Sequence, residues 1–140
     1  MKVKIVGLIT VLSLLLAAIP GFQAHAAVVD WQQGVSIQPA SSTDFGTSTF
    51  RQSVDKAAAS GANHITLIIP VRQTNIQSSD VAVSGETPTD ASLSSASGYI
   101  KSKGLSVGFA IHVNPYDGQW RAFINPGDRA AWFANYGTIL

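Results

Sequence analysis

Two hydrophobic periods alternate along residues 34–140. Strands are predicted at residues 34–39 (GVSIQP), 64–71 (HITLIIPV) and 105–113 (LSVGFAIHV). Between and after them, apolar residues recur at helical spacing near residues 49–58, 87–100 and 125–136. Residues 64–71 are apolar on both faces, as in a parallel strand that is covered on both sides. The order strand, helix, repeated three times, predicts an α/β fold with parallel strands and right-handed connections.

Local motifs predict where the helices begin and end. Thr49 opens a T-x-x-Q capping box for the first helix, and Gly61 stands where a left-handed C-cap glycine is expected. Thr87 is the predicted N-cap of the second helix, with Pro88 at its first position, and Gly104 ends it. Asn125-Pro126-Gly127-Asp128 opens the third predicted helix, whose candidate buried residues are Trp132, Phe133 and Tyr136.

The spacing of the strands favours a barrel. Strand starts near residues 34, 64 and 105 fit successive units of a (β/α)₈ TIM barrel, which needs roughly 250 residues. The predicted fold is therefore the first three β/α units of an incomplete barrel. A doubly wound sheet is the alternative, but neither a G-x-G-x-x-G nor a P-loop pattern follows the first strand. Three strands leave two open edges and an uncovered inner face, so we expect poor stability or self-association.

The third strand indicates which face is which. Its odd positions, from Leu105 to Val113, are bulky and apolar, whereas its even positions are small or polar. Because side chains alternate along a strand, the bulky face should meet the helices and the other should face the barrel interior. His112 and Asn114 are the last residues on the inner face. By the same parity, Gln38 should end the first strand and Arg72 should follow the second. These side chains are expected at the C-terminal rim, where barrel enzymes carry their sites.

The N-terminal residues have the pattern of a secretory signal peptide. Lys2 and Lys4 precede an apolar run, which Pro20-Gly21 ends, and Ala24-His25-Ala26 forms an A-x-A cleavage site. We therefore predict a signal peptide at residues 1–26, a mature domain at residues 27–140, and a secreted, extracellular protein. An uncleaved membrane anchor is the alternative. No second apolar run is long enough to span, so no stable membrane span is expected after cleavage.

Composition narrows the classes of ligand. The formal net charge is +1, which argues against nucleic acid because phosphate binding needs many cations on one face. The chain has no cysteine, so an exported form would depend on packing without disulfides. Its three histidines are scattered along the sequence, and they predict neither a metal site nor a cofactor.

Residues 112–126 (HVNPYDGQWRAFINP) concentrate side chains that bind polar, ring-shaped ligands. Each has a simpler structural explanation when it is taken alone. His112 could be a hydrogen-bonded packing residue, Arg121 a surface arginine, and Trp120 a residue packed under its own loop. Asp117-Gly118 is most simply a turn, and Glu86 a helix-start acid. The hypothesis of a ligand site depends on their joint position after the third strand.

Several motifs resemble the N-terminal half of barrel glycoside hydrolases. They are a T-P-T-D helix start, K-x-x-G-L-x-V before the third strand, H-V at its end, a D-G-x-W-R loop and a W-F-x-x-Y helix. The sequence is most similar to the family 113 β-mannanase-like group, with family 5 cellulases and mannanases as more distant relatives. The resemblance extends from Gly34 to Leu140.

This resemblance implies retaining hydrolysis of a β-linked polysaccharide of the mannan or glucan type. Such enzymes use two carboxylates about 5 Å apart, which in this family are glutamates after the fourth and seventh strands. The one glutamate here, Glu86, matches neither position. The catalytic pair is therefore expected beyond the end of this chain, which would be an inactive fragment. The resemblance implies substrate-binding roles for His112, Asn114, Trp120, Arg121 and Arg72.

Two other functions remain open from the sequence. One is a non-catalytic carbohydrate-binding or surface-interaction protein that uses the rim aromatics alone. The other is an α/β domain with an unrelated small-molecule site.

Overall fold

The computed structural model describes residues 31–140, and the predicted signal peptide lies outside the described residues. The three strands are β1 (Gly34–Ile37), β2 (His64–Gln73) and β3 (Ser106–Pro115). The helices are α2 (Ser48–Ala59), α3 (Asp90–Ser102) and α4 (Arg129–Gly137), with short 3₁₀ turns η1 (Asp44–Gly46) and η2 (Arg121–Phe123). The strands form a parallel sheet in the order β1-β2-β3. The predicted α/β order with parallel strands is confirmed.

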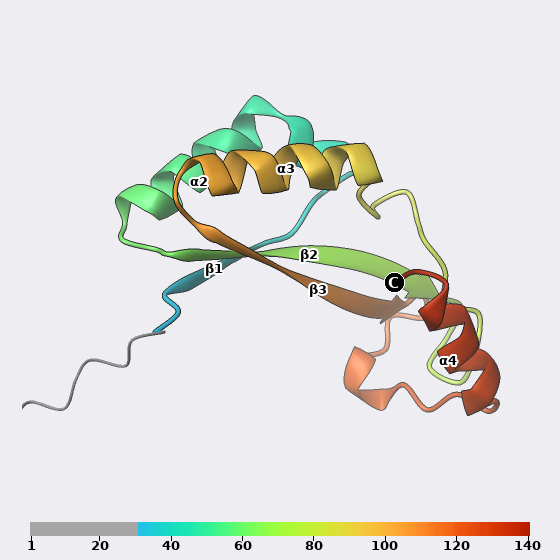
Figure 1. The fold of residues 1–140 in the computed structure, drawn as a ribbon. Helices are drawn as coiled ribbons and strands as arrows, with labels where there is room; N and C mark the ends of the chain where they lie inside the picture. The colour runs from blue at the N-terminus through green and yellow to red at the C-terminus, as the bar shows by residue number, and fades with distance from the viewer. Residues whose placement is uncertain (1–30) are drawn as a thin grey trace, which may run out of the picture. The chain divides into compact units, whose positions relative to one another are not determined.

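Helices α2 and α3 lie on one face of this sheet (Figure 1). Their contact with the sheet is a core of buried apolar side chains that includes Val54 of α2, Ile65 and Leu67 of β2, and Ile100 of α3. These four side chains have no exposed surface, and burying each stabilises the fold by about 1.5–3 kcal/mol. The predicted helical stripe of α3 therefore faces the core.

The alternation predicted for β3 is confirmed by its contacts. Leu105 and Val107 belong to the core under α2 and α3. Gly108 faces the other way, because a Cβ added there would lie 3.0 Å from His64 Nε2 and 3.8 Å from Thr66 Oγ1. His112 and Asn114 have the parity of Gly108 and therefore belong to the face opposite the helices. This face is called the inner face below.

Both predicted N-caps are wrong by two residues. Thr47, not Thr49, caps α2 by accepting a hydrogen bond from Phe50 N at 3.2 Å. Thr89, not Thr87, caps α3 by accepting from Ser92 N at 3.2 Å. Both caps have extended backbone, as an N-cap requires. The predicted helix ends are confirmed, since Gly61 and Gly104 adopt φ of +91° and +75°.

Helix α4 lies beside the carboxyl ends of β2 and β3 (Figure 1). Trp132 and Tyr136 are half-buried against a small cluster around Val71 and Val113, and their rings stack at 5.3 Å. Phe133 was expected to be buried but is 67% exposed: its ring contacts that of Trp132 edge to face at 5.1 Å and is not part of the cluster around Val71 and Val113. Within residues 31–140, no helix has the length and apolar character needed to cross a membrane.

Candidate functional site

The predicted rim residues come together where β2 and β3 end. The parallel register places Pro70 beside His112 and Arg72 beside Asn114. Strand β2 extends to Gln73, so Arg72 lies within the strand and shares the inner face with Asn114. The structure therefore brings Arg72, His112 and Asn114 to the rim formed by the carboxyl ends of β2 and β3. Gln38 follows the last residue of β1 and is exposed.

His112 is half-buried and lies near a positive charge. Burial lowers the pKa of its imidazole below the ordinary value of 6.5, and the Arg121 guanidinium lowers that pKa further. Both effects disfavour the charged ring. The imidazole is therefore neutral at pH 7, with one nitrogen able to donate and the other able to accept a hydrogen bond. A neutral donor and acceptor suits a sugar hydroxyl, which needs both.

A shallow pocket of about 260 Å³ adjoins His112. Its lining consists of Ile111, His112, Val113, Arg121, Ile124 and Trp132. Arg121 begins the 3₁₀ turn η2 and is exposed, so its guanidinium can reach a ligand in this pocket. The structure thus places Arg121 close to His112, as the sequence analysis expected.

Trp120 does not pack under its own loop. Its side chain is 67% exposed, and Phe123 contacts it edge to face with ring centroids 5.9 Å apart. Trp120 is not part of the lining of the pocket beside His112. It therefore presents a flat apolar surface to solvent, of the kind that stacks on a pyranose ring.

Arg72 is held by partners on two sides. Its Nη2 donates to Glu86 Oε2 at 2.7 Å, and its guanidinium lies over the Tyr116 ring at 5.4 Å from the centroid. Its backbone exchanges two hydrogen bonds of 2.9 Å with Ala82. The side chain is 25% exposed, so some of its donors still reach solvent.

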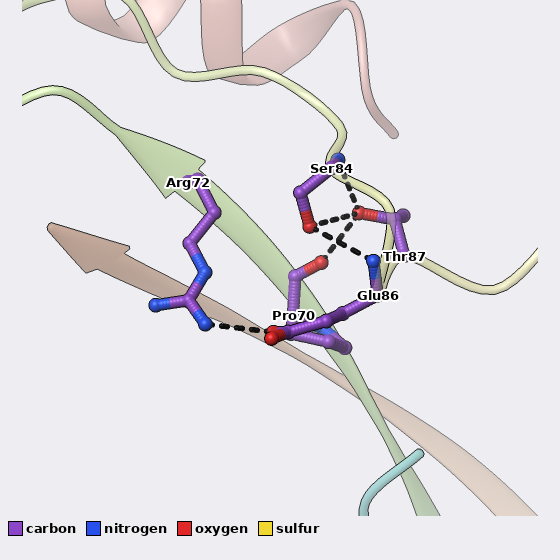
Figure 2. Close-up of polar contacts among 5 residues, drawn as sticks. All are labelled: Pro70, Arg72, Ser84, Glu86 and Thr87. Atoms are coloured by element: carbon purple, nitrogen blue, oxygen red, sulfur yellow. Dashed lines mark hydrogen bonds and ion pairs between the residues drawn. The ribbon is translucent and has the colours of Figure 1, made fainter. Parts of the chain in front are cut away.

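The connection from β2 to α3 brings Glu86 to this rim, as Figure 2 shows. The buried Thr87 hydroxyl donates to Pro70 O at 2.6 Å and accepts from Ser84 N at 2.8 Å. Ser84 Oγ in turn accepts from Glu86 N at 3.3 Å. Since β2 extends beyond β1, the bond from Thr87 to Pro70 O and the pairing of Ala82 with Arg72 satisfy backbone groups of β2 that β1 does not reach.

The loops that follow β2 and β3 are tied to each other. Asp117 accepts from Ile76 N at 3.1 Å, and the Asn125 N–H donates to Ile76 O at 2.7 Å. Gly118 has φ of +76°, which confirms the predicted turn. In the first loop the Thr74 hydroxyl donates to Asp80. This bond, followed by those from the Ser78 side chain and the Thr74 backbone, lowers the pKa of the Asp80 carboxyl to about 2. These bonds hold the loop that carries Trp120 and Arg121.

The sequence analysis missed two residues of this rim, Glu86 and Tyr116. Glu86 was taken for a helix-start acid, whereas α3 begins at Asp90 and Glu86 pairs with Arg72. A pair that lies fourteen positions apart in the sequence, one partner in a strand and the other in a loop, has no local sequence pattern.

In the part of the chain that the structure describes, no group of three or more His, Cys, Asp or Glu side chains could hold a metal ion.

Comparisons with known proteins agree with this geometry. The model of Glycoside Hydrolase Family 113 matches residues 38–140. A GH113 β-1,4-mannanase structure superposes with a TM-score of 0.71 at 23% sequence identity, over 77% of this chain. The GH113 β-mannanase AaManA from Alicyclobacillus acidocaldarius, in complex with ManMIm, gives 0.68 at 22% identity over 77% of this chain. No curated protein matches.

The likeness to solved structures supports the barrel over a doubly wound sheet, since three parallel strands with their helices superpose on these mannanases. The chain spans 38% of the length of the first and 37% of the second. The family match covers most of the sequence, including every residue of the candidate site. The chain therefore belongs to glycoside hydrolase family 113.

Proposed function

We propose that this chain forms the first three β/α units of an exported glycoside hydrolase that acts on a β-linked polysaccharide of the mannan or glucan type, with retention of configuration. Its share of the enzyme is part of the sugar-binding rim. Membership in family 113 supports the reaction class, and the β-mannanases among the similar structures support mannan as the first substrate to test.

One observation carries this proposal: Arg72, His112 and Asn114 meet on the inner face at the carboxyl ends of β2 and β3. The guanidinium donates, the neutral imidazole donates and accepts, and the amide does both. These donors and acceptors can bind the hydroxyl groups of an uncharged sugar. Trp120 follows β3 in the sequence and is exposed, so it would stack on a further sugar ring.

The catalytic pair is proposed to lie outside these 140 residues. A retaining mechanism needs two carboxyl groups about 5 Å apart, one as acid and one as nucleophile. Glu86 is the one glutamate here, and its carboxylate is engaged by Arg72. We therefore expect no release of reducing sugar when the 140-residue protein is incubated with mannan, cellulose or xylan. Release above a heat-inactivated control would contradict this.

A non-catalytic carbohydrate-binding protein is the second candidate, favoured by the exposure of Trp120. The test is equilibrium binding of manno- and cello-oligosaccharides by calorimetry, with Trp120→Ala and the control Phe133→Ala, an equally exposed aromatic on α4. Tight binding by the short chain that Trp120→Ala alone abolishes would favour this candidate. Weak binding that depends on Arg72 and His112 would favour the hydrolase.

Export is proposed from the signal-peptide pattern of residues 1–26. The check is the N-terminus of protein recovered from the culture medium of a secreting host, which should be Ala27 by mass spectrometry. Retention of the full chain in the membrane fraction would support the anchor instead.

A further inference from the structure

The long side chain of Arg72 would sample many rotamers if its partners were removed. An arginine loses rotamer entropy when it is ordered, so a ligand that had to order it would bind more weakly. In this structure the guanidinium is already placed, between the Glu86 carboxylate at 2.7 Å and the Tyr116 ring at 5.4 Å.

Glu86 owes its position to the connection that carries it. The Thr87 hydroxyl fixes this connection to Pro70 O, and the Ala82 backbone pairs with that of Arg72. The carboxylate therefore approaches Arg72 from a segment that is itself anchored to β2 on both sides of it. Glu86 is also accessible, with 43% of its side chain exposed, so the pair is expected to add little to stability.

We infer that Glu86 is a positioning residue for sugar binding: its carboxylate, with the Tyr116 ring, holds the Arg72 guanidinium at the rim so that its other N–H groups face a sugar hydroxyl. The inference rests on the proposed function for the identity of the ligand. The placement of Arg72 by Glu86 can be tested without any ligand.

The first experiment measures affinity for mannotriose with Glu86→Ala, Glu86→Gln and the control Asp90→Asn. Asp90 lies four residues further along, in the first turn of α3, and has no contact with Arg72 among the interactions of the described residues. Glu86→Ala should weaken binding about threefold to tenfold, because sugar must then order the arginine. Glu86→Gln keeps an acceptor of the same shape and should recover part of the loss, whereas Asp90→Asn should change nothing.

The second experiment reads Arg72 directly. Phenylglyoxal modifies guanidinium groups, and peptide mass spectrometry gives the labelling of each arginine. The labelling of Arg72 is divided by that of Arg129, a reference arginine on α4 that donates to Asn125. Glu86→Ala should raise this ratio several-fold, and Glu86→Gln, which keeps one oxygen acceptor, should give an intermediate value. Thermal unfolding of each variant shows whether it folds, and labelling well below every melting temperature keeps the unfolded fraction from changing the ratio, since Arg72 is less exposed than Arg129 in the folded chain.

The outcomes separate the two proposals. An unchanged labelling ratio in folded Glu86→Ala overturns the positioning role whatever the sugar results. Suppose that Arg72→Ala binds mannotriose more weakly, whereas Glu86→Ala raises the labelling ratio and leaves the affinity unchanged. That result overturns the role of Glu86 in sugar binding. If the unmodified chain binds no oligosaccharide, the proposed function fails, while the labelling ratio still shows whether Glu86 places Arg72.

Discussion

Two parts of the helix-covered side of the sheet differ sharply in how well they are covered. Under α2 and α3, Leu67 and Ile100 have no exposed surface. Further along the same side, Phe109 of β3 is 55% exposed. It borders an open groove of about 430 Å³ that also includes Ile111, Leu93 and Tyr136. All of these residues are apolar and have the parity or spacing of core positions.

The difference follows from the number of neighbours. Strand β2 has a strand on each side and two helices above it, whereas β3 is at the edge of the sheet. An apolar side chain on an edge strand needs the next unit of the sheet to cover it. Coverage is thus a property of position in the sheet rather than of the residue.

The largest effect should come from the covered region. Ile100→Ala removes a fully buried side chain and should lower the free energy of unfolding by about 2–5 kcal/mol. Phe109→Ala, a larger truncation at the edge, should cost less than about 1 kcal/mol because over half of that side chain is already in water. Urea unfolding compares the two. Equal losses would mean that the groove beside Phe109 is closed in solution.

A matched pair of glycines tests the inner face. A methyl group at Gly108 would meet the His64 ring at 3.0 and 3.2 Å, so Gly108→Ala should destabilise by about 1–3 kcal/mol. Gly98 lies within α3 with nothing within 4 Å of an added methyl group, so Gly98→Ala should stabilise by about 0.5–1 kcal/mol. Thermal melts of the two variants should therefore move in opposite directions. A neutral Gly108→Ala would show that His64 moves aside easily.

The open edge should also promote self-association. On the inner face Ile68 is only 6% exposed, whereas Phe109 beside the groove is 55% exposed, so the groove is the expected contact. Phe109→Asp should shift the protein toward monomer in sedimentation velocity, because a charge at this edge opposes pairing. Val83→Asp changes an equally apolar, 66% exposed side chain in the β2–α3 connection and should have little effect. A protein that is monomeric without any substitution would contradict this prediction.

The smallest effect concerns His112. Its pKa in the folded protein is below 6.5, so the unfolded chain binds more protons as the pH falls. Stability from this group is complete above 6.5 and is lost as the pH falls from there through the lowered pKa. His112→Gln should flatten this part of the pH profile of unfolding. A profile that is the same in both proteins would mean that the histidine is solvated in the folded state.

Much of the fold was predictable because its determinants are local. Alternation along β3 has a period of two, so the side on which Leu105 and Gly108 lie follows from the sequence alone. The choice between Thr47 and Thr49, or between Thr87 and Thr89, was not predictable in this way. Both threonines of each pair suit a cap locally, and the choice depends on tertiary contacts such as the bond from Thr87 to Pro70.

The candidate site was predictable in part. Arg72, His112 and Asn114 were expected at one rim, since the carboxyl ends of neighbouring parallel strands lie at the same edge, and the register confirms that they meet. Their roles in binding sugar stay predictions. Glu86 and Tyr116 could not be assigned, because their contacts with Arg72 join residues that loops separate.

By itself the sequence determined the order of the elements and the inward position of the polar strand ends, since both depend on periods of two to four residues. The parallel sheet then follows from the alternation of strands and helices. Tertiary structure decided which threonine caps each helix, that Glu86 holds Arg72, and that Phe109 and Phe133 stay exposed. These features depend on which distant segments come into contact, and a local pattern carries no information on that.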